Sequence, residues 1–142
     1  MKFIYLGAEI NQDVRSDKEI ERRCNIAKEN FSKIAYLLTS KKLKITTKLR
    51  IVKCYFFSIF TYGCESWTLS KVLEDKIDAM EMWCLRRIGN IKWRDRVTNE
   101  SVLQKLKTKR QPLYSIQKRK IKYFGHVKRK WNNINNYHRG EN

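Results

Sequence analysis

Apolar residues recur at helical spacing along most of this chain. In the first long segment they follow one another at steps of four and three residues, which places Ile20, Cys24, Ala27, Phe31, Ile34 and Leu38 on one face of an α-helix. Comparable spacing predicts further helices. The full set covers residues 17–39, 47–63, 71–88 and 112–131, with a short helix after Thr98. This pattern indicates a mainly α-helical bundle of about five helices.

Residues that favour helix ends stand at the edges of these segments. Polar side chains that accept backbone N–H groups precede three of them, a proline opens another, and a glycine follows one. We therefore expect a capping box from Ser16 and Glu19, N-caps at Thr46 and Ser70, a first helical position at Pro112 and a helix end at Gly63.

The segment 47–63 has apolar residues on two faces. One face holds Leu49, Val52, Phe56, Ile59 and Gly63, and the other holds Ile51, Tyr55, Ser58 and Tyr62. A helix that is apolar on two sides is packed on two sides. We expect it at the centre of the bundle.

The first residues, KFIYLGAEI at 2–10, have the pattern of a strand that is buried on both faces. No second convincing strand follows, so this segment is expected to be an orphan strand without a sheet. At the other end, residues 132–142 are polar and without periodicity, which predicts a disordered tail.

Positive charge is concentrated in the second half of the chain. Residues 1–85 carry 15 Lys and Arg against 11 Asp and Glu, whereas residues 86–142 carry 17 against 3, and the whole chain has a net charge of +18. This asymmetry points to a polyanionic partner, most simply nucleic acid. A solvated basic surface that serves only solubility is the alternative.

Membrane and export signals are not seen in the sequence. No basic-then-apolar leader opens the chain, and the longest apolar run, residues 51–64, contains Lys53 and is shorter than the ~20 residues of a membrane span. We expect an intracellular protein, nuclear or cytoplasmic, without a membrane partner. Its four cysteines, Cys24, Cys54, Cys64 and Cys84, are expected to be reduced core residues.

Candidate catalytic and metal-binding groups are few. The two histidines, His126 and His138, do not suffice for a nucleophile–base–orienter set, and no P-loop or dinucleotide-binding motif is present. The cysteine spacing does not fit zinc. Glu74, Asp75 and Asp78 could hold a divalent cation, but a solvated, salt-bridged helix face is the expected role. No cofactor, metal or small-molecule substrate is expected for this chain.

Several motifs, in order, resemble the reverse transcriptases of non-LTR (LINE-like) retrotransposons. They are FIYLGAEI, KLRIVKCYFFSIFTYGCESWTL, MEMWCLRRIGNIKWRDRVTNESVL and KRKIKYFGHVKR, of which YGCESWTL and WRDRVTNESVL are the most distinctive. The matched stretch runs from the last strand of the polymerase palm through the thumb, over residues 3–130. The resemblance implies a palm remnant at 1–12, a thumb-like three-helix bundle at 13–90, a basic helical extension at 91–131 and a tail at 132–142.

The resemblance also implies what the orphan strand is. In that family the segment matching Tyr5, Leu6 and Gly7 forms a hairpin next to the primer end, packed on palm strands encoded upstream. Polymerisation in the family uses an aspartate pair of the palm to hold two Mg²⁺ ions. No Asp-Asp pair occurs in this sequence. We therefore expect nucleic-acid binding without stand-alone polymerase activity.

Basic residues on polar helix faces and loops are the candidate contacts to RNA–DNA or DNA duplexes and to single strands, without sequence preference. Arg22, Arg23 and Lys33 lie on the first helix, and Lys41, Lys42 and Lys44 on the connector after it. A second patch holds Arg86, Arg87, Lys92, Arg94 and Arg96 around Trp93, which could stack on bases or plug the core. The third patch, favoured here, is Lys118, Arg119, Lys120 and Lys122, extended by Lys128, Arg129 and Lys130.

Two other hypotheses stay open. The chain could be a non-functional or domesticated basic helical protein with a structural or interaction role. It could also be a polymerase subunit that takes its catalytic aspartates from another chain.

Overall fold

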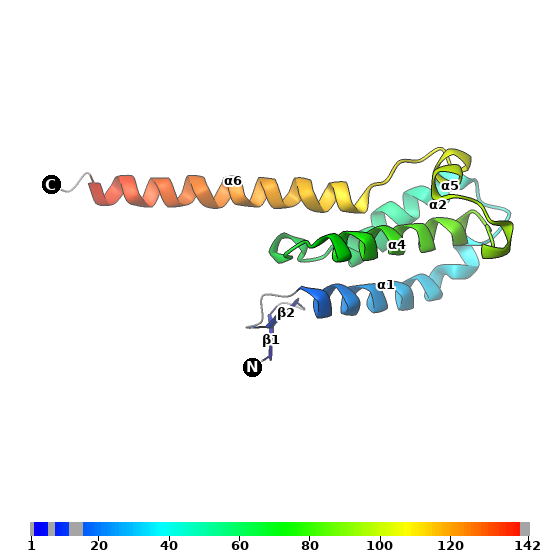
Figure 1. Cartoon of the computed structure of the whole chain (residues 1–142), viewed down its shortest axis with the longest axis horizontal. Helices are drawn as coiled ribbons and strands as arrows, with labels where there is room; N and C mark the ends of the chain where they lie inside the picture. The colour runs from blue at the N-terminus through cyan, green and yellow to red at the C-terminus, as the bar shows by residue number, and fades with distance from the viewer. Residues whose placement is uncertain (1, 6–7, 12–15, 140–142) are drawn as a thin grey trace.

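The protein is a helical bundle with one long helix that projects from it (Figure 1). In the computed structural model the backbone is described for residues 2–5, 8–11 and 16–139, and side chains for residues 16–134. The helices are α1 (Asp17–Leu38), α2 (Ile45–Ile51), α3 (Phe57–Phe60), α4 (Lys71–Ile88), α5 (Asn99–Lys105) and α6 (Pro112–Arg139). Short turns of 3-10 helix, η2 (Cys64–Ser66) and η3 (Trp93–Asp95), join them. The expected mainly α-helical bundle is confirmed.

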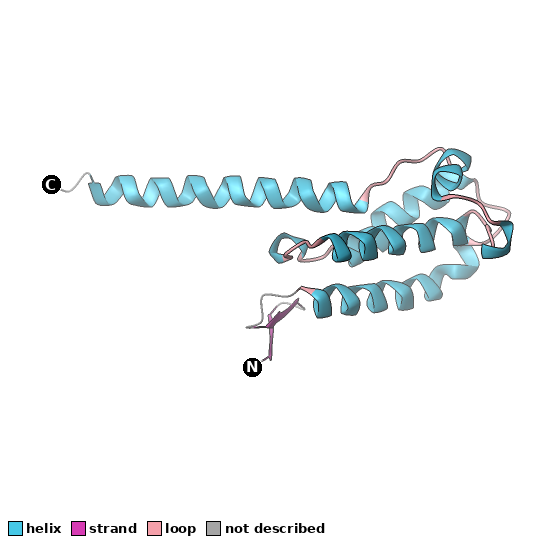
Figure 2. Cartoon of the chain, viewed as in Figure 1, coloured by secondary structure: helices cyan, strands magenta, loops and turns pink. Residues whose placement is uncertain are grey.

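The N-terminal segment is a hairpin, so the prediction of a single orphan strand is wrong. Strand β1 (Lys2–Tyr5) pairs antiparallel with β2 (Ala8–Asn11), with Phe3 opposite Ile10 (Figure 2). The alternation of Ala8 to Asn11 is too short and too polar to read as a second strand from pattern alone. The Leu6–Gly7 part of the YLG motif lies outside the described residues.

The core is aromatic at its centre. Three aromatic rings pack against one another: Phe31 of α1, Phe56 of the segment between α2 and α3, and Trp83 of α4. Their ring centroids are 5.1 to 6.3 Å apart. A second pair, Phe60 and Trp67, has centroids 6.1 Å apart. Such pairs prefer edge-to-face and offset arrangements and hold the three main helices together.

The segment between α2 and α3 is a π-helix, η1 (Val52–Phe56). Its signature is the hydrogen bond from the Phe57 N–H to the Val52 carbonyl, five residues back. Together α2, η1 and α3 make one helical rod through residues 45–60. The wider π turn changes which residues face inward. Val52, Phe56 and Phe60 are buried at steps of four.

This shift corrects the expected second apolar face of the rod. Tyr55 and Tyr62 are exposed, as is Ser58. The step of 3.6 residues that the sequence pattern assumes does not hold through a π turn, so the two predicted faces do not both pack. The rod nevertheless contacts α1 and α4 and lies within the bundle.

The helix ends follow the sequence in part. Ser70 accepts the Leu73 N–H and Gly63 adopts a left-handed φ of 72°, as expected. The predicted capping box at Ser16 is wrong, because the Ser16 hydroxyl instead accepts the N–H of Thr68 at 2.8 Å. The predicted cap at Thr46 is wrong as well, because α2 begins at Ile45 after an extended Lys44.

The last helix is longer than predicted. The sequence indicated an end at 131 and a disordered tail from 132, but α6 continues to Arg139, and residues 140–142 lie outside the described part. Uncharged Asn and Tyr residues after 131 carry no periodic signal, yet they do not break a helix that is already formed.

Candidate nucleic-acid interface

The loop between α4 and α5 is held in place by side-chain hydrogen bonds. The Asp95 carboxylate accepts the Lys92 backbone N–H at 2.9 Å and closes the turn η3. Arg86 donates from Nη2 to the Val97 carbonyl at 2.7 Å and to Asn99 Oδ1 at 3.0 Å. The loop is therefore fixed at both ends of the WRDRV motif.

Trp93 stands on this loop with 83% of its surface exposed. This excludes the alternative in which the residue plugs the core. Its neighbours Lys92, Arg94 and Arg96 are exposed too. An indole on a fixed loop among cations offers a stacking face together with phosphate-binding groups.

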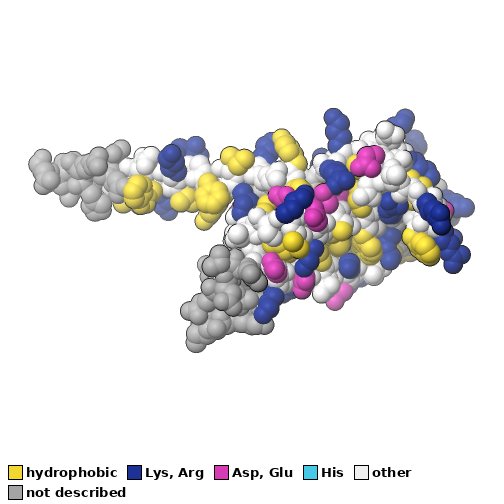
Figure 3. All heavy atoms as spheres, viewed as in Figure 1, with side chains coloured by type: hydrophobic (Ala, Val, Ile, Leu, Met, Phe, Trp, Pro, Cys, Tyr) yellow, Lys and Arg dark blue, Asp and Glu magenta, His cyan; other side chains and the backbone are white. Residues whose placement is uncertain are grey.

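The connector between α1 and α2 brings a second basic segment to the same end of the bundle. Both α1 and α4 end there, on the right in Figure 1, and Lys and Arg side chains gather at this end in Figure 3. Lys41, Lys42 and Lys44 are exposed on the connector. We call this surface the basic end, defined by Lys41, Lys42, Lys44, Lys92, Trp93, Arg94 and Arg96.

The run KLKTKR at 105–110 holds basic residues that the sequence pattern did not single out: Lys105 at the end of α5, and Lys107 and Lys109 just after it. All three are exposed, and α5 lies at the same end of the molecule. Alternating lysines in a connector were the signal that could have identified them.

Several residues that the sequence predicts as nucleic-acid contacts instead pair with side chains of the bundle. Arg23 is buried, with Nε 2.9 Å from Glu19 Oε1 and its guanidinium 4.8 Å from the centre of the Tyr62 ring. Its expected place on the polar face of α1 is therefore wrong. Arg22 lies 3.4 Å from Glu19, whereas Lys33 is exposed on the same helix.

Arg86 and Arg87 also differ from each other. Arg86 is half-buried and serves the loop, so it positions the site instead of facing solvent. Arg87 is exposed and lies 4.3 Å from the centre of the Trp83 ring.

The cluster at the start of α6 is divided between packing and solvent. Arg119 donates to Glu65 Oε1 and to the carbonyl and hydroxyl of Thr61, at 2.6 to 3.2 Å. Lys120 donates to the Trp67 carbonyl. Lys118 and Lys122 are exposed. Half of the favoured cluster thus fastens α6 to the bundle.

The motif YGCESWTL is a structural junction. Gly63 makes the turn, Cys64 and Trp67 are buried, Glu65 pairs with Arg119, and Thr68 bonds Ser16. These contacts join the rod, α1, α4 and α6. Of the two distinctive motifs, this one builds the fold and WRDRV presents exposed groups.

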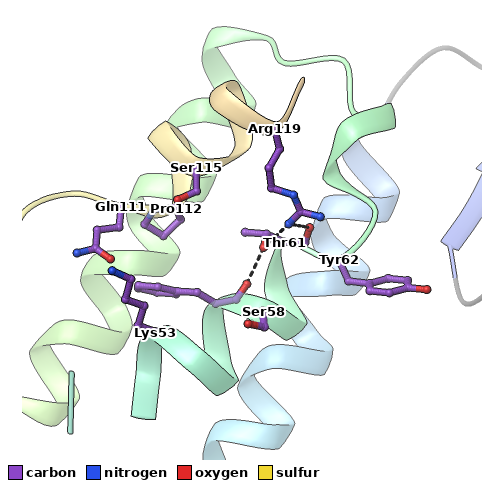
Figure 4. A pocket seen from close by; sticks show the side chains of 9 residues that line it. Lys53, Ser58, Thr61, Tyr62, Gln111, Pro112, Ser115 and Arg119 are labelled. Atoms are coloured by element: carbon purple, nitrogen blue, oxygen red, sulfur yellow. Dashed lines mark hydrogen bonds between the residues drawn. The ribbon is translucent and has the colours of Figure 1, made fainter. Parts of the chain in front are cut away.

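A cavity of about 370 Å³ lies between the rod and the start of α6 (Figure 4). Lys53 and Arg119 are the charged residues among those that line it, and Arg119 turns toward Thr61. Ser58 and Ser115 complete a polar wall. The lining holds no histidine or cysteine that could act with these hydroxyls.

The acidic face of α4 is paired. Lys71 lies 3.2 Å from Asp75, Lys76 lies 2.7 Å from Glu21, and Asp78 pairs with Arg110. Among the described residues, no three His, Cys, Asp or Glu side chains gather in a way that could hold a metal ion.

The cysteines differ from expectation at one position. Cys64 and Cys84 are buried and Cys24 is half-buried, but Cys54 is exposed on the π-helix. Burial raises the pKa of the Cys64 thiol to about 11 and also raises the pKa of Cys84 and Cys24. Within residues 16–134 we find no helix with the length and apolar content to cross a membrane.

Comparison with known proteins gives one informative relative. No protein-family model and no solved structure match the chain significantly. An uncharacterized transposon-derived protein of Caenorhabditis elegans is 30% identical over 135 residues, covering 91% of this chain and 47% of the relative. This chain therefore spans about half the length of that protein. The chain is related to a protein of transposon origin.

Proposed function

We propose that this chain is part of a non-LTR retrotransposon reverse transcriptase and binds nucleic acid without sequence preference. The ordered motifs of the sequence support the polymerase origin, and the transposon-derived relative supports the broader class. The role assigned to this chain is binding. Nucleotidyl transfer is left to the part of the polymerase that carries the metal-binding aspartates.

The exposed Trp93 is the observation that carries this proposal. A large aromatic side chain with 83% exposure buries little area and contributes almost no hydrophobic stabilisation to the bundle. Asp95 and Arg86 nevertheless fix the backbone that presents it. A stacking role toward bases accounts for both facts.

The rest of the basic end fits phosphates. Its lysines and arginines come from the connector at 41–44 and the loop at 92–96, and they would displace counterions from a nucleic-acid backbone. Phosphate contacts and stacking on any base carry no sequence preference. Log K is expected to fall with log salt by roughly 0.7 per phosphate neutralised on single strands.

The test uses the full chain and a fluorescent single-stranded oligonucleotide in low and moderate salt. Trp93→Ala is expected to weaken binding by about tenfold, because stacking on one base is worth about 1 to 3 kcal/mol. Trp131→Ala is the matched control, since Trp131 is an exposed tryptophan on α6, away from the basic end. Its affinity is expected to stay within about twofold of the wild type.

A charge test complements the stacking test. Lys92→Gln with Arg94→Gln is expected to lower the salt slope, whereas Lys18→Gln with Lys71→Gln removes the same charge elsewhere and is expected to lower it less. Equal effects of the two pairs would show only general attraction to a basic chain. Equal affinity of Trp93→Ala and wild type would overturn the proposed site.

A further inference from the structure

The outer part of α6 carries a row of apolar side chains that nothing covers in the described residues. The start of α6 is packed, with Ile116 fully buried and Leu113 half-buried against the bundle. The outer part of α6 projects from the bundle, as Figure 1 shows, and none of the described side chains at 121–134 is buried. Five apolar residues follow, with exposed fractions between 43% and 73%: Ile121, Phe124, Val127, Trp131 and Ile134.

These five residues lie on one face of the helix. Their steps of three and four residues place them within about 140° of arc at 100° per residue. The same arc contains Leu113 and Ile116, which pack on the bundle. The packed face of α6 therefore continues outward as an unpartnered stripe, which we call the α6 stripe. Contiguous apolar surface of this kind marks an interaction site.

The charge around the stripe is of one sign. Between Pro112 and Arg139, α6 contains eight Lys and Arg residues and no Asp or Glu. Lys128 and Lys130 stand on opposite sides of the middle of the stripe, about 50° and about 110° from it. An occupant of the stripe therefore meets apolar side chains in the centre and positive charge at both edges.

Charge and shape limit what can cover it. A second copy of α6 would bring eight more positive charges against the first eight, which repel. Ile121, Val127 and Ile134 have no π-face and no hydrogen-bonding group, so they do not suit nucleotides. A flat bilayer meets the bundle first, because the stripe continues the face of α6 that packs on the bundle. A single helix, about 10 Å wide, has the dimensions to lie along the projecting part of α6.

We propose that the α6 stripe binds an amphipathic helix of a partner protein whose flanks are acidic. Apolar residues of the partner at three- and four-residue spacing pack against Phe124, Val127 and Trp131. Glu or Asp at its flanking positions face Lys128 and Lys130, as charged flanks do in paired helices. This interaction is separate from nucleic-acid binding at the basic end.

The test uses the full chain carrying Trp93→Phe. Trp67 is buried and Trp83 half-buried, so Trp131 then remains the exposed tryptophan. The probe is a synthetic amphipathic helix of about four turns with Leu on one face and Glu at its flanks. Saturable binding with a blue shift of Trp131 emission is expected. A peptide with Lys in place of Glu is expected to bind at least tenfold more weakly.

Variants of the stripe complete the experiment. Phe124→Gln with Val127→Gln changes exposed side chains, so the helix is expected to keep its circular dichroism while the labelled peptide binds at least tenfold more weakly. Tyr114→Gln is the matched control, because Tyr114 is an exposed aromatic residue of α6 outside the stripe. Its affinity for the peptide is expected to be unchanged.

Four results would overturn the proposal. They are equal binding of a scrambled acidic peptide, an unchanged affinity in the Phe124–Val127 variant, a shift of Trp131 emission by phosphatidylserine vesicles or oligo(dT) but not by the peptide, and dimerisation of the free chain that the same variant abolishes.

Discussion

Arg86 and Val97 are joined by a 2.7 Å hydrogen bond from the guanidinium Nη2 to the backbone carbonyl. The same nitrogen lies 3.0 Å from Asn99 Oδ1. Arg86 is in the last turn of α4, so one side chain ties the end of that helix to the loop and to the first residue of α5. The exposed Trp93 is presented from the backbone between these points.

Replacing Arg86 with Gln is expected to loosen this loop without unfolding the bundle. Gln is too short to reach both partners, and the loss of charged hydrogen bonds should cost about 1 to 2 kcal/mol. Amide exchange of residues 92–98 should quicken, and oligonucleotide affinity should fall severalfold because Trp93 is no longer held. Arg87→Gln is the control, since the Arg87 guanidinium lies over the Trp83 ring and not against the loop. Unchanged exchange in the Arg86 variant would contradict a positioning role.

Arg119 is expected to stabilise the attachment of α6, in contrast to its neighbour Lys118. It contacts Glu65 at 2.6 Å and the Thr61 carbonyl at 3.1 Å, whereas Lys118 is exposed. Arg119→Gln should lower the free energy of unfolding by about 1 to 2 kcal/mol, and Lys118→Gln by less than about 0.5 kcal/mol. Urea denaturation measures both. A double-mutant cycle with Glu65→Gln should show coupling, and additive effects would refute the pairing.

Glu81 is expected to make the protein less stable as the pH rises toward neutrality. The side chain is 2% exposed, and burial raises its pKa to about 7 from the usual 4.5. The Gln111 N–H, which donates to the carboxylate at 3.0 Å, and the nearby Arg110 lower the pKa, while Asp78 adds to the increase. The folded protein therefore binds more protons than the unfolded chain between these two values. The stability that protonated Glu81 contributes to the fold is fully present below pH 4.5 and is lost as the pH rises through about 7.

Glu81→Gln removes that titration and keeps an acceptor for Gln111. The variant should be more stable than the wild type at pH 8, by about 3 kcal/mol, and the two curves should converge near pH 4.5. Urea titrations at several pH values give both curves. Glu74→Gln, on the half-exposed part of α4, should leave the pH dependence as it is. A parallel pH dependence in Glu81→Gln and wild type would exclude Glu81 as its origin.

Helix positions could be predicted here because long amphipathic segments carry a repeating signal. The bounds 71–88 match α4, and Ser70 caps it as expected, since a side-chain oxygen next to an apolar series has few other roles. Ser16 has the same local sequence signal, but the Thr68 N–H lies close by in space and takes the hydroxyl. A sequence pattern reports only the local preference for a helix cap. A hydrogen-bond partner from elsewhere in the fold can override that preference.

The basic surface could be predicted only as a set of candidates. Lys41 and Lys92 lie far apart in the sequence, and only the fold places their segments at one end of the bundle. Charge alone could not separate Arg23 and Arg119, which are paired with Glu19 and Glu65, from the exposed Lys33 and Lys118. The sequence likewise left open whether Trp93 is exposed, because tryptophan occurs both in protein cores and at surfaces that stack on bases.

The π-helix predicts an unusual tolerance to deletion. Val52, Phe56 and Phe60 are buried at steps of four, which exceeds the 3.6 residues of an α-helical turn. Removing Cys54, an exposed residue inside η1, leaves these positions at steps of three and four, which a regular α-helix satisfies. The rod should then become α-helical throughout with its core contacts kept. Deleting Lys33, an exposed residue of regular α1, instead rotates Leu38 by about 100° relative to Phe31.

We therefore expect the Cys54 deletion to fold cooperatively, with a loss of less than about 2 kcal/mol, and the Lys33 deletion to lose several kcal/mol or the cooperative transition itself. Thermal melting followed by circular dichroism and urea denaturation compare the two. Cys54→Ser serves as the control for the loss of the thiol and should match the wild type. If both deletions were equally destabilising, the bundle would require the extra residue of the π turn. The packing of the rod would then depend on the greater width of the helix at η1.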